Sequence, residues 1–145
     1  MTYPDPTVAA IVGEHFVPLM VNIRQQPDLL QRYQAFWTPS VCVIAQDGTL
    51  VYRNEGWMPA PEFATMLILA RGYYFYRRKR HNQAALVFNE MVTRYPRSPF
   101  APEAQYMLGV CIYLSTGSSE EQEEAWRMLL QWYPASLWAT KARGI

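Results

Sequence analysis

The two cysteines are the residues of this sequence that could carry thiol chemistry. Cys42 and Cys111 are 69 residues apart and lie in the apolar stretches "VCVI" and "GVCIY". Thiol–disulfide exchange needs a thiolate of lowered pKa with a second thiol close by, and the chain contains no Cys-x-x-Cys. We therefore expect two buried, reduced thiols, and neither a disulfide nor a redox pair within this chain.

Other catalytic, metal or cofactor chemistry has little support in the sequence. His15 and His81 are far apart and have no Cys or carboxylate cluster at ligand spacing, so we expect no metal site. There is no phosphate-binding loop or glycine-rich nucleotide motif, and two isolated histidines do not suggest a Ser-His-Asp triad. The sequence therefore predicts no catalytic residue, no cofactor and no small-molecule substrate.

A basic run follows an aromatic one in "YYFYRRKRH", which ends at residue 81. Basic side chains beside aromatic ones can bind nucleic acid. Cations at the end of a helix also complement its dipole, and a net charge of +1 gives no global sign of a nucleic-acid partner. We favour the interpretation that these cations lie at the end of a helix, and we expect no nucleic-acid partner. Binding through Arg77, Arg78, Lys79 and Arg80 stays open as a third interpretation.

The composition predicts a folded chain of one domain or two small ones. Among 145 residues, 50% are apolar and 17% are charged, which is enough apolar material for a core. No run of 18 apolar residues occurs, so no membrane span is expected. The start "MTYPDPTVAA" lacks the basic and apolar regions of a signal peptide, so we expect a cytoplasmic protein. Aromatic residues make up 14%, so some should line a surface groove or an interface.

The first half of the chain shows an α/β pattern. Asp5-Pro6 is typical of a helix start, and Asp47-Gly48 between two apolar runs is a strong hairpin signal. "HFVPLMVNI" is apolar and rich in β-formers, which predicts a buried strand with Pro18 at an edge or entrance. The expected elements are helices over 6–13 and 27–36 and strands over 15–23, 40–45 and 49–53.

From residue 63 onward the pattern is helical. Asn82 is a candidate N-cap, and Ser118 with Glu121 forms a candidate capping box. The expected helices cover residues 63–78, 82–95, 102–115, 118–133 and 137–143. "YPRSPFA" (95–101) recurs as "YPASLWA" (133–139), and a period of 38 residues with helix pairs predicts a helical solenoid.

These helices resemble tetratricopeptide repeats. The residues that carry the resemblance in the first unit are Gly72, Phe75, Ala84, Phe88 and Pro96. The second unit keeps Gly109 and Pro134, and Trp126 stands where Phe88 does in the first. It departs from the pattern where Gln122 and Glu123 replace the small residues, and its turn has one extra residue, so it could be a capping unit. The resemblance implies that small residues let helices approach and that aromatic residues fill the gap.

Residues 1 to about 68 resemble a thioredoxin-like domain that begins after its redox motif. "FVPLMVNI" is similar to the strand after the family's redox helix, "QRYQAFWTPSVCVI" to the next helix and the Thr-Pro strand, and "DGTLVYRNEGW" to the closing hairpin. The resemblance implies a cis peptide bond at Pro39 and backbone pairing by Thr38 with an extended partner segment. The alternative is that Pro39 makes a tight turn into a strand.

The two halves together resemble bacterial fusions of these modules, in which a cysteine motif often precedes a segment like "TYPDPTV". In thioredoxin-like domains the strand before the cysteine motif is the centre of the sheet, and that strand has no counterpart in this sequence. Either the neighbouring strands close up, or another chain fills the slot, or the sheet has an open edge. Unpaired edges invite pairing, so we expect a protein partner or a homo-oligomer, unless the gene product starts earlier.

These observations predict an α/β and then all-α chain: a truncated thioredoxin-like domain over 1–68 and a tetratricopeptide-like helical array over 69–145. The expected function is a non-catalytic interaction module, an adaptor or accessory subunit. The alternative is a thiol-disulfide oxidoreductase whose Cys-x-x-Cys is lost or lies upstream. The candidate peptide-groove residues are Tyr73, Tyr76, Tyr106 and Tyr113.

Overall fold

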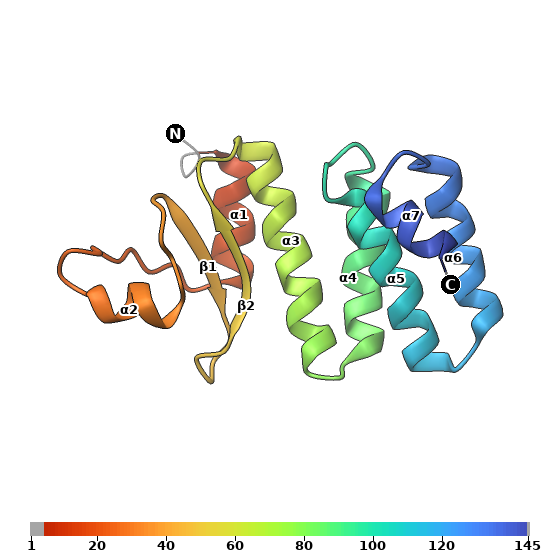
Figure 1. The fold of residues 1–145 in the computed structure, drawn as a ribbon, viewed down its shortest axis with the longest axis horizontal. Helices are drawn as coiled ribbons and strands as arrows, with labels where there is room; N and C mark the ends of the chain where they lie inside the picture. The colour runs from red at the N-terminus through yellow and green to blue at the C-terminus, as the bar shows by residue number, and fades with distance from the viewer. Residues whose placement is uncertain (1–4, 145) are drawn as a thin grey trace. The chain divides into compact units, whose positions relative to one another are not determined.

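The structure is a computed structural model that describes residues 5–144. The chain divides into two compact units, residues 1–70 and residues 71–145. Helix α3 (Ala60–Arg77) contains the boundary between them. A two-stranded sheet with helices comes first and a series of helices follows, as Figure 1 shows.

The first unit begins with helix α1 (Pro6–His15), which starts where the sequence predicts. Asp5 is its N-cap, and the Asp5 carboxylate accepts hydrogen bonds from the backbone N–H groups of Thr7 and Val8, at 2.9 and 3.1 Å. These bonds satisfy donors that have no partner within the helix. Val8 is fully buried, so α1 is fixed to the core of this unit near its first turn.

Strands β1 (Ser40–Ile44) and β2 (Leu50–Glu55) form the antiparallel hairpin that Asp47-Gly48 predicts. The Asp47 carboxylate accepts a hydrogen bond from the Thr49 N–H at 3.0 Å, and Gly48 has a φ of +82°. That backbone conformation favours glycine, because other residues meet a steric penalty there. The register pairs Ser40 with Glu55 and Cys42 with Arg53.

The predicted strand over residues 15–23 is wrong. Residues 16–22 are irregular, and the side chains of Val17, Leu19 and Met20 are 96%, 82% and 94% exposed. Within the part of the chain that the structure describes, β1 pairs only with β2, so this segment has no strand neighbour. Apolar residues of this kind favour a strand only where a sheet can bury them. The N–H and C=O groups of an exposed backbone can bond to water and do not require pairing with another strand.

Helix α2 (Pro27–Arg32) is shorter than the predicted helix over 27–36. Gln34 has a φ of +51°, which is outside the right-handed helical region, and the chain turns there toward β1.

The second unit contains α4 (His81–Arg94), α5 (Ala101–Thr116), α6 (Ser119–Trp132) and α7 (Leu137–Arg143). Helix α5 packs against α4 and α6, and α7 packs against both α5 and α6 (Figure 1). Ser118 caps α6 by accepting the Glu121 N–H, as predicted, but the Ser118 N–H donates to the Thr116 hydroxyl, so only one of the two bonds of the predicted capping box forms. The predicted N-cap of α4 is wrong: Arg80 occupies that position without a side-chain cap, and Asn82 lies inside the helix.

The repeated sequence forms a repeated turn. The N–H of Ser98 donates to the Tyr95 carbonyl, and the N–H of Ser136 donates to the Tyr133 carbonyl, both at 3.0 Å. The alanines that end the two copies, Ala101 and Ala139, are both fully buried at the start of a helix. The 38-residue period is therefore a period of local backbone structure as well as of sequence.

No helix among residues 5–144 is long and apolar enough to cross a membrane.

Candidate interaction surface

The loop over residues 33–39 connects α2 to β1 and is anchored to the hairpin at its first end. The Arg53 guanidinium donates to the carbonyls of Tyr33 and Gln34, at 3.1 and 2.8 Å. The Tyr33 hydroxyl donates to the carbonyl of Gly48 at 3.2 Å. These bonds join the end of α2 to β2 and to the hairpin turn, so they fix the direction in which the loop leaves the helix.

The second end of the 33–39 loop is anchored as well. The Gly56 N–H donates to the Pro39 carbonyl at 2.7 Å, and the Ser40 hydroxyl donates to the Trp37 carbonyl. The Thr38–Pro39 peptide bond is cis. The backbone pairing of Thr38 with a partner segment stays a prediction. Hydrogen bonds therefore tie this loop to β2 at one end and to Gly56 at the other.

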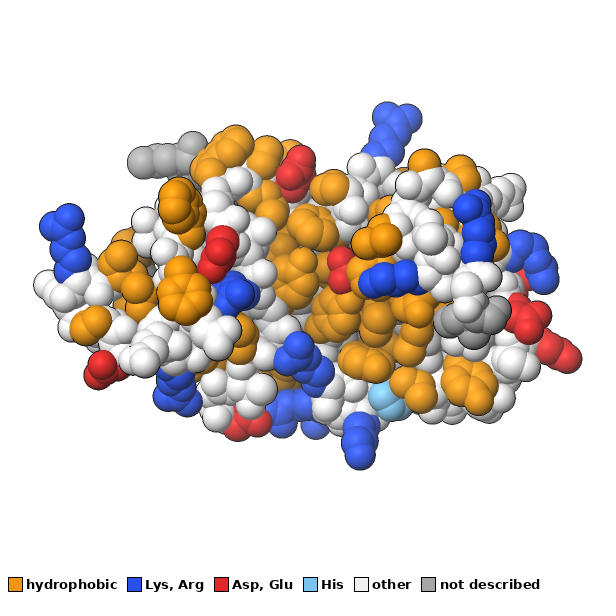
Figure 2. Space-filling model, viewed as in Figure 1, with side chains coloured by type: hydrophobic (Ala, Val, Ile, Leu, Met, Phe, Trp, Pro, Cys, Tyr) orange, Lys and Arg blue, Asp and Glu red, His pale blue; other side chains and the backbone are white. Residues whose placement is uncertain are grey.

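The loop presents aromatic side chains to solvent although its backbone is tied down. Phe36 is 76% exposed and Trp37 is 69% exposed. Trp57 is 71% exposed and directly follows Gly56, whose N–H holds Pro39. Figure 2 shows hydrophobic side chains on the visible face of this unit. The Gly56–Pro39 hydrogen bond brings the backbone before Trp57 beside the end of the 33–39 loop, and several large apolar side chains exposed on one small unit are typical of an interaction site. We call Phe36, Trp37 and Trp57 the aromatic surface.

The cysteines are placed in two different environments. Cys42 is half-buried on β1 opposite Arg53, and burial raises the pKa of its thiol, although the Arg53 charge acts in the other direction. Cys111 is buried in α5, and burial raises the pKa of its thiol to about 12. Both shifts disfavour the thiolate that nucleophilic exchange requires. Residues 5–144 also contain no group of three His, Cys, Asp or Glu side chains placed to hold a metal ion.

The tyrosines predicted to line a groove are mostly engaged within the chain. The half-buried Tyr73 donates its hydroxyl to Glu103, and the Tyr76 ring lies 5.8 Å from the His81 ring. Tyr106 stacks on Trp126 at 5.1 Å between ring centroids and lies 5.2 Å from Trp138. Tyr113 is 45% exposed. The structure therefore gives three of the four tyrosines an aromatic or polar neighbour inside the unit.

The glycines of the repeat pattern lie under aromatic rings. A Cβ on Gly72 would come within 2.4 Å of the Phe88 ring, and a Cβ on Gly109 would come within 2.6 Å of the Trp126 ring. Ala84 and Phe88 are fully buried in α4. The remaining pattern residues lie at or near the helix ends: Phe75 in α3, Pro96 after α4 and Pro134 after α6.

Sequence reasoning missed the aromatic surface as a set. The signal was present in "FWTP", where two aromatic residues precede the Thr-Pro pair. The expectation that some aromatic residues line an interface named no members of this surface. Trp57 is recognised as part of it only through the hydrogen bond between Gly56 and Pro39.

The comparison with protein families agrees with the fold of the first half of the chain. A family model described as a thioredoxin-like domain matches residues 2–71. No curated protein and no solved structure matches the chain. The thioredoxin-like part is thus shown for residues 2–71, and the helices beyond them lie outside the match.

Proposed function

We propose that this chain is a non-catalytic protein–protein interaction module, an adaptor or accessory subunit of a larger assembly. The observation that carries the proposal is the aromatic surface: Phe36 and Trp37 are exposed on the 33–39 loop, Trp57 is exposed in the segment after β2, and the Gly56–Pro39 hydrogen bond joins the two segments. Aromatic side chains on a backbone that is already fixed bury a large area on binding and lose little conformational entropy. Such residues contribute most of the binding energy at many interfaces.

The sheet supports the same function. Among the described residues the sheet has two strands, so each strand has one edge without a strand neighbour. An exposed edge offers backbone N–H and C=O groups to an extended segment of another chain, and side chains beside it add specificity. Thr38 is exposed next to the start of β1, at the position where the family resemblance implies backbone pairing.

The thiols support a function without redox chemistry in this chain. Burial raises the pKa of the Cys42 thiol and of the Cys111 thiol. A redox pair needs two thiols in reach of each other and one of lowered pKa. The thioredoxin-like part would then act as a binding scaffold.

The helices support a tetratricopeptide-like array as the second module. The contacts of Gly72 with Phe88 and of Gly109 with Trp126 place a glycine of one helix under an aromatic ring of the next. The Tyr-Pro turn recurs with the same hydrogen bond. Tandem helix pairs of this kind build extended surfaces for other proteins.

The test compares partner recovery between matched variants in extract of the source cells. Trp37→Ser with Trp57→Ser removes most of the aromatic surface, and Leu86→Ser, on a 70% exposed leucine of α4, is the matched control. We expect the wild-type chain and the control to recover the same proteins in fixed ratio, and the double variant to lose at least one of them. Equal recovery by all three would contradict the role of this surface. The double variant Cys42→Ser with Cys111→Ala should recover the same partner proteins as the wild-type chain. Loss of partners by this double variant, when it is shown to be folded, would favour a redox role.

A further inference from the structure

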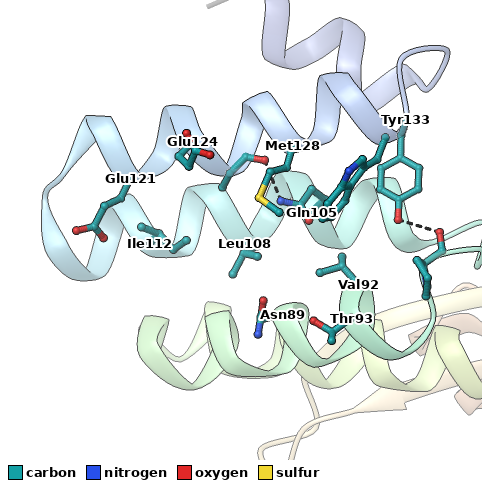
Figure 3. A pocket seen from close by; sticks show the side chains of 13 residues that line it. Asn89, Val92, Thr93, Gln105, Leu108, Ile112, Glu121, Glu124, Met128 and Tyr133 are labelled. Atoms are coloured by element: carbon teal, nitrogen blue, oxygen red, sulfur yellow. Dashed lines mark hydrogen bonds between the residues drawn. The ribbon is translucent and has the colours of Figure 1, made fainter.

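A groove of about 720 Å³ lies on the second unit between α4 and α6, with α5 as its floor (Figure 3). Its lining is mainly apolar, from Val92, Leu108, Ile112, Ala125, Met128 and Trp132. Its volume is within the range of sites that hold a drug-sized ligand or a few side chains of a partner.

The two ends of the groove differ in chemistry. At one end the Tyr133 hydroxyl donates to the Pro96 carbonyl at 2.8 Å, which joins the end of α6 to the turn after α4. At the other end stand Glu121 and Glu124, both exposed (Figure 3). A ligand along the groove would therefore meet a hydrogen-bonded wall at one end and negative charge at the other.

The floor of the groove holds a buried polar side chain that is only half satisfied. Gln105 is 1% exposed, and its amide N–H donates to the Ala125 carbonyl at 2.8 Å. Its side-chain oxygen has no hydrogen-bond partner among the described residues. A buried acceptor without a donor destabilises a fold, whereas an apolar side chain of the same size would not. This oxygen would accept a donor brought in by a ligand that displaces the side chains around it.

We propose that this groove binds an amphipathic helix of a partner protein, with basic residues at the end that lies over Glu121 and Glu124. Residues 121–132 of α6 extend for about 18 Å, the length of twelve helical residues. A groove between two helices takes the apolar face of a third helix. The acidic end selects a basic partner and opposes an acidic one. Arg127 pairs with Glu124, so a basic residue of the partner would compete for that carboxylate.

The buried acceptor further specifies the anchor residue. A tryptophan or tyrosine joins a large apolar body to one hydrogen-bond donor, which suits an apolar groove with one unpaired oxygen at its floor. The proposal deepens the proposed function and rests on it, because it names one class of partner. It concerns residues 89–133, whereas the aromatic surface belongs to the other unit, so each can fail while the other holds.

The experiment selects ligands without knowing the natural one. A displayed library of randomised twelve-residue helices is selected on the full chain, and binding of the enriched peptides is measured with backbone NMR shifts. We expect apolar residues at helical spacing, an aromatic anchor and Lys or Arg at one end, with shifts over residues 105–112 and 121–133. Failure to enrich any sequence, enrichment of acidic sequences, or shifts that lie elsewhere would overturn the proposal.

Charge variants test the acidic end with a matched control. Glu121→Gln with Glu124→Gln should weaken binding of the selected peptides about tenfold, and added salt should weaken binding to the wild type. Glu90 forms the same kind of helical ion pair, with Arg94, but does not line the groove, so Glu90→Gln should leave the affinity unchanged. Equal effects of the two substitutions would overturn the assignment of the acidic end.

A substitution of the floor separates binding from folding. Gln105→Leu removes the unpaired oxygen, so we expect an unchanged or higher unfolding midpoint together with an affinity at least several-fold lower. A lower midpoint with unchanged affinity would show that Gln105 serves the fold alone. Sedimentation tests whether a second copy of the chain occupies the groove. Concentration-dependent dimers, with backbone NMR shifts that map to the groove, would overturn the proposal. Equal binding of a neutral amphipathic peptide and of the basic peptides would also overturn it.

Discussion

The ring of Phe88 covers Gly72 so closely that a Cβ at position 72 would lie 2.4 Å from the Phe88 Cε1 atom. Trp126 covers Gly109 in the same way, and a Cβ there would lie 2.6 Å from the indole Nε1. Non-bonded heavy atoms do not approach to such distances, so only glycine allows these helices to pack as they do. The α3–α4 pair and the α5–α6 pair therefore share one kind of contact, in which a glycine of the first helix lies under an aromatic ring of the second.

Replacing Gly72 with alanine should destabilise the helical unit. Overpacking of a close contact costs about 1–3 kcal/mol, and the helix preference of alanine over glycine returns about 1 kcal/mol of it. We expect a net loss in the free energy of unfolding, measured with guanidinium. Gly13→Ala is the control, because Gly13 lies within α1 with nothing inside 4 Å of an added Cβ, and it should be neutral or stabilising. A Gly72→Ala chain as stable as the Gly13→Ala chain would contradict the close contact.

Gly109→Ala should have a second effect besides the loss of stability. The Trp126 indole N–H donates to the Tyr106 carbonyl at 3.1 Å, and the same indole stacks on the Tyr106 ring. A methyl group at position 109 would displace the indole from both partners. We expect a red shift of tryptophan emission together with a loss of about 1–3 kcal/mol, as for overpacked cores. An unchanged emission spectrum would show that the indole keeps its place.

Glu103 should make stability depend on pH. Burial raises the pKa of this carboxyl above its ordinary value of 4.5, although the hydrogen bond from Tyr73 and the charge of Lys141 lower it. Between the ordinary and the raised pKa the folded chain binds more protons than the unfolded chain, so stability falls as pH rises through this window. Glu103→Gln should flatten that part of the stability curve, since the amide does not titrate.

Tyr73→Phe supplies the complementary change at the same site. It removes the hydrogen bond that lowers the Glu103 pKa, so the pH window of falling stability should extend upward. Guanidinium unfolding at a series of pH values from 4 to 8 measures both effects. A curve for Glu103→Gln that parallels the wild type would show that Glu103 does not cause the pH dependence.

The thiols should react slowly and in a fixed order. Cys111 is buried and its thiol has a pKa of about 12, so it should react with iodoacetamide only when the helical unit opens. Cys42 is half-buried with a raised pKa, so it should react first, yet more slowly than free cysteine. Timed labelling followed by peptide mass spectrometry gives both rates. Faster labelling of Cys111 than of Cys42 would contradict the burial of α5.

Local signals in the sequence predicted most of the fold. Asp47-Gly48 predicted the hairpin because its turn needs a positive φ, and the Ser118 cap predicted the start of α6 because helix ends need side-chain acceptors. The strand over 15–23 failed because strand preference depends on a neighbouring strand, and the described residues provide none.

The candidate sites were harder to predict than the elements. Val92 and Leu108 have the helical spacing of ordinary core residues, and no local pattern shows that α4 and α6 leave a groove above α5. Gln105 was the available signal, because it is a polar residue in the otherwise apolar run "AQYMLGVCIYL". The aromatic surface depends on hydrogen bonds between residues distant in sequence, such as Arg53 with Gln34, and sequence spacing does not reveal these.

The most direct test of an interaction module is the mass of the untagged, native species that contains this chain, determined by native mass spectrometry after gentle purification. We predict a complex of fixed stoichiometry with at least one other chain or a second copy, from which Trp37→Ser with Trp57→Ser removes at least one component. A wild-type chain that is recovered alone as a monomer, with the same mass as the double variant allowing for the substitutions, would contradict the account.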